Sequence, residues 1–467
     1  MAAQEWDVVV LGAGPASEIV AGRTAAGGLR TVVVEEHLVG GECTFYACMP
    51  SKGLLRPADV LAAARRVPGA REAIDGDLDA GAALARRNEI VDDWDDARQA
   101  RWLDSVGVGL VRGHGRITGD RRIEVASPDG PVVLNAAKAV VVSTGSSSLI
   151  PPIDGLADIR FWNSRDVTAA KEIPRRLLVL GGGAVGVEMA QAWRTLGSEE
   201  VTIVERADHL LPTEEPFAGK LLAAAFEEQG IAVITGAGMV AARREGSDGP
   251  VVSTLADGRE VTSDEILISV GRRPRTDDIG LESLGLEPGK YVDVDDHLVA
   301  KGVSEGWLYA VGDVNGRALL THMGKYQGRI AGDHILGKKV EAVGDVVAIP
   351  RVVYTDPQVA SVGLTERAAR DKGIDAVAID SDLNETAGSV VTGLGIEGPA
   401  RLVFDLRSET IVGATFTGPD IGELLHSATI AIAGRVPFDR LWHAVPCFPA
   451  LSEVWLMLME GYERERG

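Results

Sequence analysis

Residues 6–36 read WDVVVLGAGPASEIVAGRTAAGGLRTVVVEE, and this stretch decides the fold. Its apolar run Val8–Leu11 is typical of a buried strand. We expect a helix from about Pro15 to Ala26, where two glycines follow, and a second strand over Thr31–Val34. Strand, glycine turn, helix and strand in this order predict a parallel βαβ unit that binds a dinucleotide.

The glycine turn and the end of the second strand carry the residues that such a ligand needs. Gly12 allows the tight turn, and Gly14 lets the backbone approach a pyrophosphate at the helix N-terminus. Ser17 stands where a third glycine is usual, and Glu35 is placed to accept hydrogen bonds from a ribose diol. The residues expected to bind this first dinucleotide are Gly12, Gly14, Pro15, Ala16, Ser17 and Glu35.

The same pattern recurs in residues 175–205, RRLLVLGGGAVGVEMAQAWRTLGSEEVTIVE. We expect strands at Leu177–Leu180 and Val201–Val204, with a helix between them that ends near Leu196. Two such units imply two dinucleotides, which a redox enzyme with one flavin and one nicotinamide explains. Glu205 suits a free 2′-hydroxyl and repels a 2′-phosphate, so NADH is favoured over NADPH. The residues expected to bind this second dinucleotide are Gly181, Gly183, Val185, Gly186 and Glu205.

Composition restricts the class of protein. The chain has 467 residues, enough for two to four domains, of which 45% are hydrophobic and 25% charged. Its net charge of −21 argues against nucleic acid or an anionic membrane as a partner. We see no signal peptide and no apolar run long enough to span a membrane, so we expect a cytoplasmic protein. In that compartment three cysteines do not form a disulfide scaffold.

Two of these cysteines, Cys43 and Cys48, lie in the stretch GGECTFYACMPSK, residues 40–52. They could form a metal clip, a structural staple or a redox pair. A metal site would need further Cys or His ligands at the spacing of zinc sites, and this sequence has none near the pair. A structural disulfide that closes so short a loop would stabilise the fold little. Lys52 and a following helix N-terminus could stabilise a thiolate, which favours the redox pair.

These segments together resemble the class I flavin disulfide reductases, which include dihydrolipoamide dehydrogenase, glutathione reductase and mercuric reductase. The resemblance covers nearly the whole chain in order. Besides the glycine turns and the cysteine stretch, it rests on STG (Ser143–Gly145), GGGAVGVE (Gly181–Glu188), VGRRP (Val270–Pro274), AVGDV (Ala310–Val314) and YTDPQVASVGLTE (Tyr354–Glu366).

The resemblance implies an α/β fold with two Rossmann-like dinucleotide-binding domains and an α+β C-terminal dimerisation domain. The implied FAD-binding domain covers residues 1–152 and 276–347, the NAD(P)-binding domain 153–275 and the dimerisation domain 348–467. It also implies a homodimer whose active site lies across the interface and takes a small-molecule substrate.

The resemblance further implies roles for single residues. Cys48 would be the thiolate in charge-transfer contact with FAD, Cys43 the interchange thiol, and Lys52 and Glu188 a pair near flavin N5. Asp313 would hold the ribityl chain. The other residues implied to contact the cofactors are Gly41, Lys52, Thr144, Gly145, Gly271, Gly312 and Thr321.

One segment departs from the family. In LWHAVPCFPALSEVWL, residues 441–456, Phe448 stands where the family has a catalytic histidine, while the glutamate that orients it is retained as Glu453. Phenylalanine carries no proton, and general acid–base catalysis is worth typically about 10²–10⁴-fold. We interpret His443 as a surface or structural residue and Cys447 as a small buried one.

The sequence therefore predicts an FAD-dependent oxidoreductase that passes electrons from NADH to the Cys43–Cys48 pair and on to a disulfide or other small acceptor, without a histidine acid/base. One alternative is NADH-dependent quinone reduction. Another is thioether or C–C bond cleavage or carboxylation, because 2-ketopropyl-coenzyme M oxidoreductase/carboxylase carries Phe at the same place. That enzyme also lacks the glutamate that is present here as Glu453. A flavin-bearing subunit that docks to a multienzyme complex ranks last.

Overall fold

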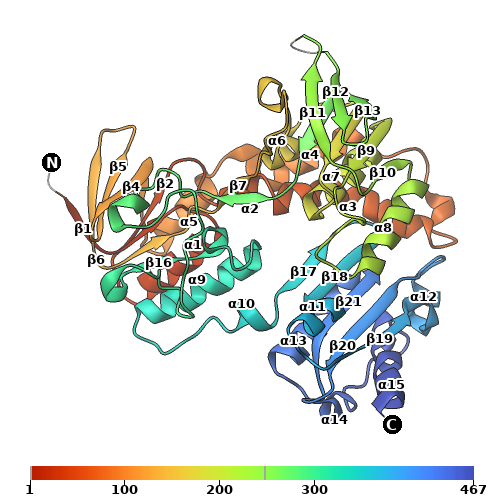
Figure 1. Cartoon of the computed structure of the whole chain (residues 1–467). Helices are drawn as coiled ribbons and strands as arrows, with labels where there is room; N and C mark the ends of the chain where they lie inside the picture. The colour runs from red at the N-terminus through yellow and green to blue at the C-terminus, as the bar shows by residue number, and fades with distance from the viewer. Residues whose placement is uncertain (1–2, 247–248, 467) are drawn as a thin grey trace. The chain divides into compact units, whose positions relative to one another are not determined.

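The computed structural model describes residues 3–246 and 249–466, and the chain divides into two compact units (Figure 1). Unit 1 comprises Met1–Pro50, Arg87–Leu149 and Gly271–Val346. Unit 2 comprises Ser51–Arg86, Ile150–Val270 and Val347–Gly467. The chain leaves one unit for the other within three helices, α3 (Cys48–Arg65), α4 (Ala80–Ile90) and α10 (Gly344–Val347). It also does so in two connections between strands, after Leu149 and after Val270.

Unit 1 is built on a sheet with the strand order β3-β2-β1-β6-β5-β4, in which β16 also pairs with β6. Its strands are β1 (Gln4–Leu11), β2 (Thr31–Glu35), β3 (Gly109–Arg112), β4 (His114–Gly119), β5 (Arg122–Ala126), β6 (Val132–Val142) and β16 (Leu308–Ala310). β1 runs parallel to both β2 and β6. Its residues Val8, Val9 and Val10 are fully buried, as expected for a central strand covered on both faces.

Helices α1 (Pro15–Ala26) and α9 (Thr321–Ile335) of unit 1 pack closely together. A Cβ at Gly328 would lie 2.6 Å from the Ala16 carbonyl oxygen, so glycine is required at this contact. Arg23 and Asp333 join the two helices by an ion pair at 2.7 Å. The remaining elements of unit 1 are α2 (Gly41–Phe45), α5 (Ala97–Ser105), the 3₁₀ helices η2 (Asp92–Trp94), η4 (Leu281–Leu284), η5 (Ser304–Gly306) and η6 (Gly312–Asn315), and the ribbon of β7 (Ser146–Ser148) with β15 (Arg272–Pro274).

Unit 2 contains a second parallel sheet, in the order β10-β9-β8-β14, and a three-stranded antiparallel sheet. The parallel strands are β8 (Arg176–Leu180), β9 (Glu200–Val204), β10 (Ile231–Ile234) and β14 (Glu265–Ile268), and the antiparallel ones are β11 (Met239–Arg244), β12 (Val251–Leu255) and β13 (Glu260–Ser263). The helices here are α6 (Ser164–Ala169), α7 (Ala184–Leu196), α8 (Pro216–Glu228) and the 3₁₀ helices η1 (Arg71–Ala73) and η3 (Leu156–Asp158).

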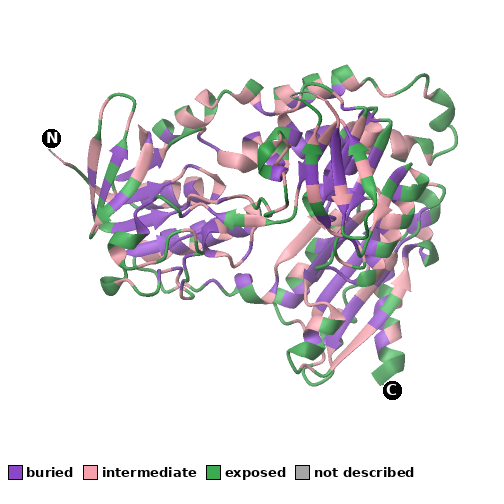
Figure 2. Cartoon of the chain, turned by 45° about the horizontal axis from the view of Figure 1, so that its top comes forward, coloured by how far each residue is buried: buried purple, intermediate pink, exposed green. Residues whose placement is uncertain are grey.

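The C-terminal part of unit 2 forms an antiparallel sheet in the order β17-β18-β21-β20-β19. Its strands are β17 (Pro350–Val353), β18 (Gln358–Gly363), β19 (Ala376–Asp382), β20 (Pro399–Asp405) and β21 (Thr410–Gly418). Its helices are α11 (Glu366–Asp371), α12 (Ala387–Thr392), α13 (Ile421–Ala433), α14 (Phe438–Leu441), α15 (Val454–Arg466), η7 (Leu383–Glu385) and η8 (Leu451–Glu453). The rings of Phe404 and Tyr462 stack with centroids 3.8 Å apart in its core. Figure 2 shows that the buried residues follow the strands.

The α/β fold class predicted from the sequence is confirmed, and both predicted strand–helix–strand units are present. The domain boundaries stay a prediction. Residues 51–86, which the sequence placed in the FAD-binding domain, group with unit 2. Across the described residues, no helix combines the length and the hydropathy needed to cross a bilayer.

Candidate functional site

The turn between β1 and α1 leaves room for a ligand. Gly12 has φ +95°, and a Cβ there would lie 2.5 Å from the Ser143 carbonyl oxygen, so only glycine fits. A Cβ at Gly14 would meet no atom within 4 Å, which leaves the helix N-terminus open to a phosphate. Gly41 brings α2 to the same turn, since its Cβ would lie 2.8 Å from the Gly14 Cα. The buried hydroxyl of Ser17 has no hydrogen-bond partner among the described residues.

The turn between β8 and α7 repeats this arrangement in unit 2. Gly181 has φ +105°, and its Cβ would lie 2.5 Å from the Ser269 carbonyl oxygen. A Cβ at Gly183 would again meet no atom within 4 Å, and one at Gly186 would collide with the Gly181 carbonyl at 1.9 Å. Val185, in the first turn of α7, is exposed. Each of these positions therefore meets the steric requirements of a dinucleotide turn.

Two glutamates make equivalent contacts at the ends of β2 and β9. Glu35 accepts hydrogen bonds from the backbone N–H groups of Ala13 and His37, both at 2.7 Å. Glu205 accepts two from the corresponding positions of the second unit, also at 2.7 Å. Both carboxylates are thereby held at the carboxyl end of the second strand, beside the glycine turn of their own unit.

Further polar groups of unit 1 gather near the start of η6. The Asp313 carboxylate accepts a hydrogen bond from the Ser146 hydroxyl and lies 3.6 Å from Arg272. Burial raises the pKa of Asp313, against the lowering effects of Ser146 and Arg272. Thr144 donates to the Arg275 carbonyl at 2.6 Å. The predicted glycines of this region, Gly145, Gly271 and Gly312, all have positive φ, of +73°, +136° and +77°.

Cys43 and Cys48 lie together, each half-buried, and both are free thiols. Cys48 is the first residue of α3, and its Sγ lies 3.3 Å from the Oγ1 of Thr321, the first residue of α9. The pKa of Cys43 is raised, first by its hydrogen bond with Cys48 and then by burial and the charge of Cys48. The two thiols are therefore coupled, because both the hydrogen bond and the charge of Cys48 disfavour ionisation of Cys43.

Glu42, which precedes Cys43, anchors the cysteine segment. Its two carboxylate oxygens accept hydrogen bonds from Arg272 and Arg275, each at 2.7 Å. The next turn is held by the Trp94 indole N–H, which donates to the Phe45 carbonyl at 3.0 Å. The sequence analysis missed Glu42. Its position next to a predicted catalytic cysteine and the RRPR run at 272–275 were the available signals.

Lys325 is a second residue that the sequence analysis missed. It follows Thr321 by four positions on α9, so both side chains project from one face of that helix. Its positive charge lowers the pKa of Cys43 and that of Glu18 on α1, although burial keeps the pKa of Glu18 above its usual range. Two thiols, an ammonium and a carboxylate thus share one region of unit 1.

In unit 2 the predicted pair of Lys52 and Glu188 is present. The Lys52 ammonium lies 2.7 Å from Glu188 Oε2 and 4.9 Å from the centroid of the Tyr354 ring. The other oxygen of the buried Glu188 accepts a hydrogen bond from the Tyr354 backbone N–H at 3.0 Å. Three elements therefore hold this pair: α3, α7 and the connection between β17 and β18.

The C-terminal segment shows Phe448 as 78% exposed on the chain. The Glu453 carboxylate is bound to the backbone: one of its oxygens accepts hydrogen bonds from the Ala450 N–H at 3.1 Å and from the Gly388 N–H at 3.0 Å. Cys447, which we interpreted as buried, is exposed in this chain, as is His443. No group of three or more His, Cys, Asp or Glu in the described ranges is placed to hold a metal ion.

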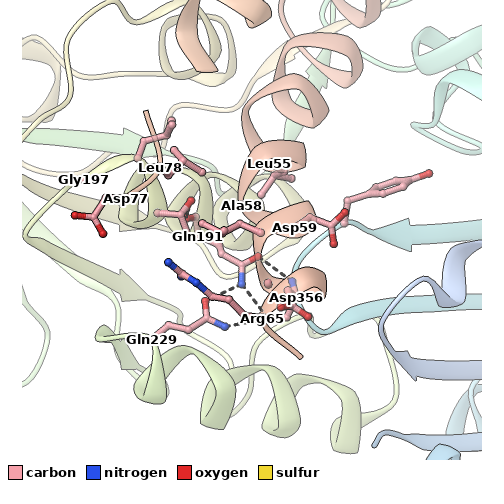
Figure 3. A pocket seen from close by; sticks show the side chains of 15 residues that line it. Leu55, Ala58, Asp59, Arg65, Asp77, Leu78, Gln191, Gly197, Gln229 and Asp356 are labelled. Atoms are coloured by element: carbon pink, nitrogen blue, oxygen red, sulfur yellow. Dashed lines mark hydrogen bonds between the residues drawn. The ribbon is translucent and has the colours of Figure 1, made fainter. Parts of the chain in front are cut away.

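Unit 2 also contains a cavity of about 480 Å³, shown in Figure 3. One face of α3, the loop residues Asp77 and Leu78, the C-terminal ends of α7 and α8, and the β17–β18 connection line it. The side chains of Gln191 and Gln229 meet at its base, where both donate to the Asp356 carbonyl, at 2.9 and 3.0 Å. None of the residues predicted from the sequence lines this cavity.

Comparison with known proteins places the chain among redox enzymes. Residues 6–328 match the family described as pyridine nucleotide-disulphide oxidoreductase, and residues 349–458 match its dimerisation domain. Dihydrolipoyl dehydrogenase of Chlorobaculum tepidum is 33% identical over 455 residues, which cover 97% of this chain and 96% of that relative. Mercuric reductase of Lysinibacillus sphaericus is 28% identical, covering 96% of this chain and 81% of that relative.

Solved structures agree with this result. LpdA from Mycobacterium tuberculosis superposes with a TM-score of 0.84 at 26% identity, covering 98% of this chain and 99% of that one. The HOCl-induced flavoprotein disulfide reductase RclA from Escherichia coli has the same fold, with a TM-score of 0.83 at 24% identity over 97% of this chain and 99% of that one.

Proposed function

The chain belongs to the pyridine nucleotide-disulphide oxidoreductase family, and from this premise we propose that it uses NADH to reduce a small disulfide at the Cys43–Cys48 pair. FAD, when bound, supplies the transfer of an electron pair between the nicotinamide and the cysteines. The observation that carries the proposal is the contact between the two thiols, with Cys48 at the N-terminus of α3. A helix N-terminus stabilises a thiolate.

The open glycine turns fit the two cofactors. The residues proposed to hold FAD are Gly12, Gly14, Pro15, Ala16, Ser17, Glu35, Gly41, Lys52, Thr144, Gly145, Gly271, Gly312, Asp313 and Thr321. We propose that NADH binds at the β8–α7 turn, with its ribose diol on Glu205. A fixed carboxylate there would repel a 2′-phosphate, so kcat/KM should be higher with NADH than with NADPH. The reverse order would refute this role of Glu205.

The two cysteines divide the work of disulfide exchange. The Cys43 thiolate attacks one sulfur of the substrate disulfide, which forms a mixed disulfide and releases the first thiolate product. Cys48 then attacks the Cys43 sulfur, closes the Cys43–Cys48 disulfide and releases the second. Two electrons pass from the pair to the substrate, and the products take up protons from solvent.

Cys43 must first lose its proton, and Phe448 offers no base for this step. We propose that the positive charge of Lys325 lowers the proton affinity of Cys43 instead. Without a proton donor for the leaving group, the best substrates are disulfides of acidic thiols, which leave as thiolates. The enzyme should therefore reduce 5,5′-dithiobis(2-nitrobenzoic acid) with a much higher kcat/KM than bis(2-hydroxyethyl) disulfide. Equal values would show that a proton donor is present.

Anaerobic titration with NADH tests the proposal as a whole. Long-wavelength absorbance from thiolate-to-flavin charge transfer after one equivalent would show that electrons reach the cysteine pair. It should be lost in Cys48→Ser. Direct bleaching of the flavin with no such band would mean that the pair is bypassed, and the proposed function would be wrong.

The match of residues 349–458 to the dimerisation domain supports a homodimer. We propose that its interface includes the C-terminal segment, because Val445 and Phe448 are 84% and 78% exposed on the single chain. Sedimentation velocity should give twice the mass of the 49.2 kDa chain. Val445→Asp should produce monomers, and a monomeric wild-type protein would overturn the assignment.

Phe448 also favours a second candidate function, in which the Cys43 thiolate attacks the sulfur of a thioether, forms a mixed disulfide that Cys48 then resolves, and releases a carbanion that CO₂ captures. A site without a proton donor lets such a carbanion persist. Incubation with a ketoalkyl thioether, NADH and labelled bicarbonate should then yield a labelled carboxylate. Recovery of the protonated ketone alone would exclude carboxylation.

A further inference from the structure

The cavity in unit 2 has the size and lining of a small-molecule site. Its volume of about 480 Å³ lies within the range of about 300–1,000 Å³ that is usual for ligand pockets. Leucines from three separate segments form its apolar wall: Leu55 and Leu61 of α3, Leu78 and Leu196. Leu55 and Leu196 are at most 5% exposed, so this wall is part of a well-packed core.

The charged groups of the cavity are mainly acidic. Asp59, Asp77 and Asp356 line it, and the lining includes one basic residue, Arg65, which is exposed. In addition, α7 ends at Leu196 and α8 ends one residue before Gln229, so two helix C-termini meet the cavity. The C-terminal end of a helix carries partial negative charge and favours a cation.

Two of the three lining aspartates have an arginine partner. Asp356 pairs with Arg66 at 2.6 Å, and Asp59 pairs with Arg56. Burial raises the pKa of Asp59 against the lowering effect of Arg56, and the carboxylates of Asp420 and Asp356 add smaller contributions that also raise it. A half-buried carboxylate close to like charges binds a cation favourably.

We propose that this cavity binds an organic cation, an amine carried on an apolar body, and that its occupancy acts on the Lys52–Glu188 pair. The ammonium would lie against Asp59 and Asp77 while the apolar body covers the leucines. The second half of the proposal rests on the proposed function, because that function gives the pair its place beside the flavin.

The connection to Lys52 and Glu188 runs through the three elements that hold the pair. On α3, Leu55 and Asp59 follow Lys52 by three and seven positions, on one face of the helix. On α7, Gln191 follows Glu188 by three positions and accepts from the Asp356 N–H at 2.8 Å. The lining residue Tyr354 is itself a donor to Glu188.

A ligand that touches Tyr354, Asp59 and Gln191 therefore contacts all three elements within two helical turns of the pair. Movement of the Tyr354 backbone would change the hydrogen bond to Glu188, and with it the position of the Lys52 ammonium. The cavity and the Lys52–Glu188 pair are thus connected by a short path of contacts between described residues. Ligand binding in the cavity can therefore change the arrangement of the pair, and the arrangement of the pair can change the affinity for the ligand.

Calorimetric titration of the FAD-loaded enzyme with tryptamine and with tryptophol tests the binding half. Both probes contain an indole, but tryptamine carries an ammonium group where tryptophol carries a hydroxyl. We expect tryptamine to bind at least about tenfold more tightly, and Asp77→Asn to weaken it severalfold. Asp75→Asn is the matched control in the same loop, because Asp75 does not line the cavity. Equal affinity for the two probes, or no binding of tryptamine at millimolar concentration, would overturn the site.

Stopped-flow reduction of the flavin by NADH tests the coupling. We expect saturating tryptamine to change this rate at least about twofold in wild type and in Asp75→Asn. In Asp77→Asn the change should need a higher tryptamine concentration. Binding without any change of rate would refute the coupling. Calorimetry does not depend on disulfide reduction, so failure of the site is distinguishable from failure of the proposed function.

Discussion

Replacement of Lys325 by methionine tests how Cys43 is activated when Phe448 provides no base. Methionine keeps most of the length of the lysine side chain and removes its charge. Because the ammonium lowers the pKa of Cys43, the variant should show a higher pKa at this thiol. Lys325→Arg keeps the charge and should restore the wild-type value.

The size of the effect follows from the position of Lys325 on α9. Side chains four positions apart start about 6 Å from each other, and Thr321 Oγ1 lies 3.3 Å from Cys48 Sγ. At an assumed separation of about 7 Å between the Lys325 ammonium and the Cys43 sulfur, a unit charge is worth about 2.4 kcal/mol at an effective dielectric of 20 and about 0.6 kcal/mol at that of water. Lys325 is exposed on the chain, so an intermediate value applies. We expect a shift of about one pKa unit, which is about 1.4 kcal/mol.

The assay is alkylation of the reduced enzyme by iodoacetamide across a pH series, with the modified peptide identified by mass. A Cys447→Ser background removes the exposed third thiol. At pH values below the pKa of Cys43, Lys325→Met should hold about tenfold less Cys43 thiolate than the wild type. The more basic thiolate is also more nucleophilic, so alkylation of Cys43 should slow only about 3.5-fold in the variant. Lys339→Met, at an exposed position beyond α9, is the control. An unmoved pH profile in Lys325→Met, or an equal shift in Lys339→Met, would refute the reasoning.

Three further predictions concern other parts of the molecule. Phe448→His should raise reduction of an alkyl disulfide by up to about 10²-fold, measured as kcat/KM, and no gain would mean that the segment does not reach the cysteines. Glu453→Ala removes an acceptor of two backbone hydrogen bonds and should lower the free energy of unfolding by about 2–3 kcal/mol in urea, whereas a purely catalytic glutamate would leave it unchanged. Burial, and next the stacked His297, lower the pKa of His334 from 6.5, so protonation favours the unfolded state. Stability should thus be complete above about pH 6.5 and fall as the pH drops below it, and His334→Gln should flatten that slope in urea titrations at pH 7.5 and 5.5.

The sequence predicted most of the fold because the deciding features are local. The helix expected from Pro15 to Ala26 has those bounds, since proline begins it and two glycines end it. Glu35 and Glu205 were predicted for the same reason, because each lies at the end of the second buried strand of a strand–helix–strand unit, and their binding roles stay predictions. The family resemblance, which rests on ordered local motifs, is confirmed by the match over residues 6–328.

What the sequence could not predict depends on contacts between distant segments. Glu42 meets Arg272 more than two hundred residues away, and no periodicity connects them. Lys325 is an ordinary polar position on α9 until the fold brings that helix to Cys43. The cavity of unit 2 likewise exists only where five separated segments meet. The role of such residues follows from three-dimensional proximity.

The C-terminal segment explains how a reductase scaffold can accommodate phenylalanine at position 448. Its backbone path is fixed by Glu453, which binds the N–H groups of Ala450 and Gly388. Gly388 tightens this contact, because a Cβ there would lie 2.1 Å from the Ala450 carbonyl carbon. Neither restraint involves the side chain at 448, so an imidazole and a phenyl ring can occupy that position with the same backbone. We therefore propose that this position can exchange histidine for phenylalanine without a change of fold, with Lys325, in the unit that carries the cysteines, as the compensating charge.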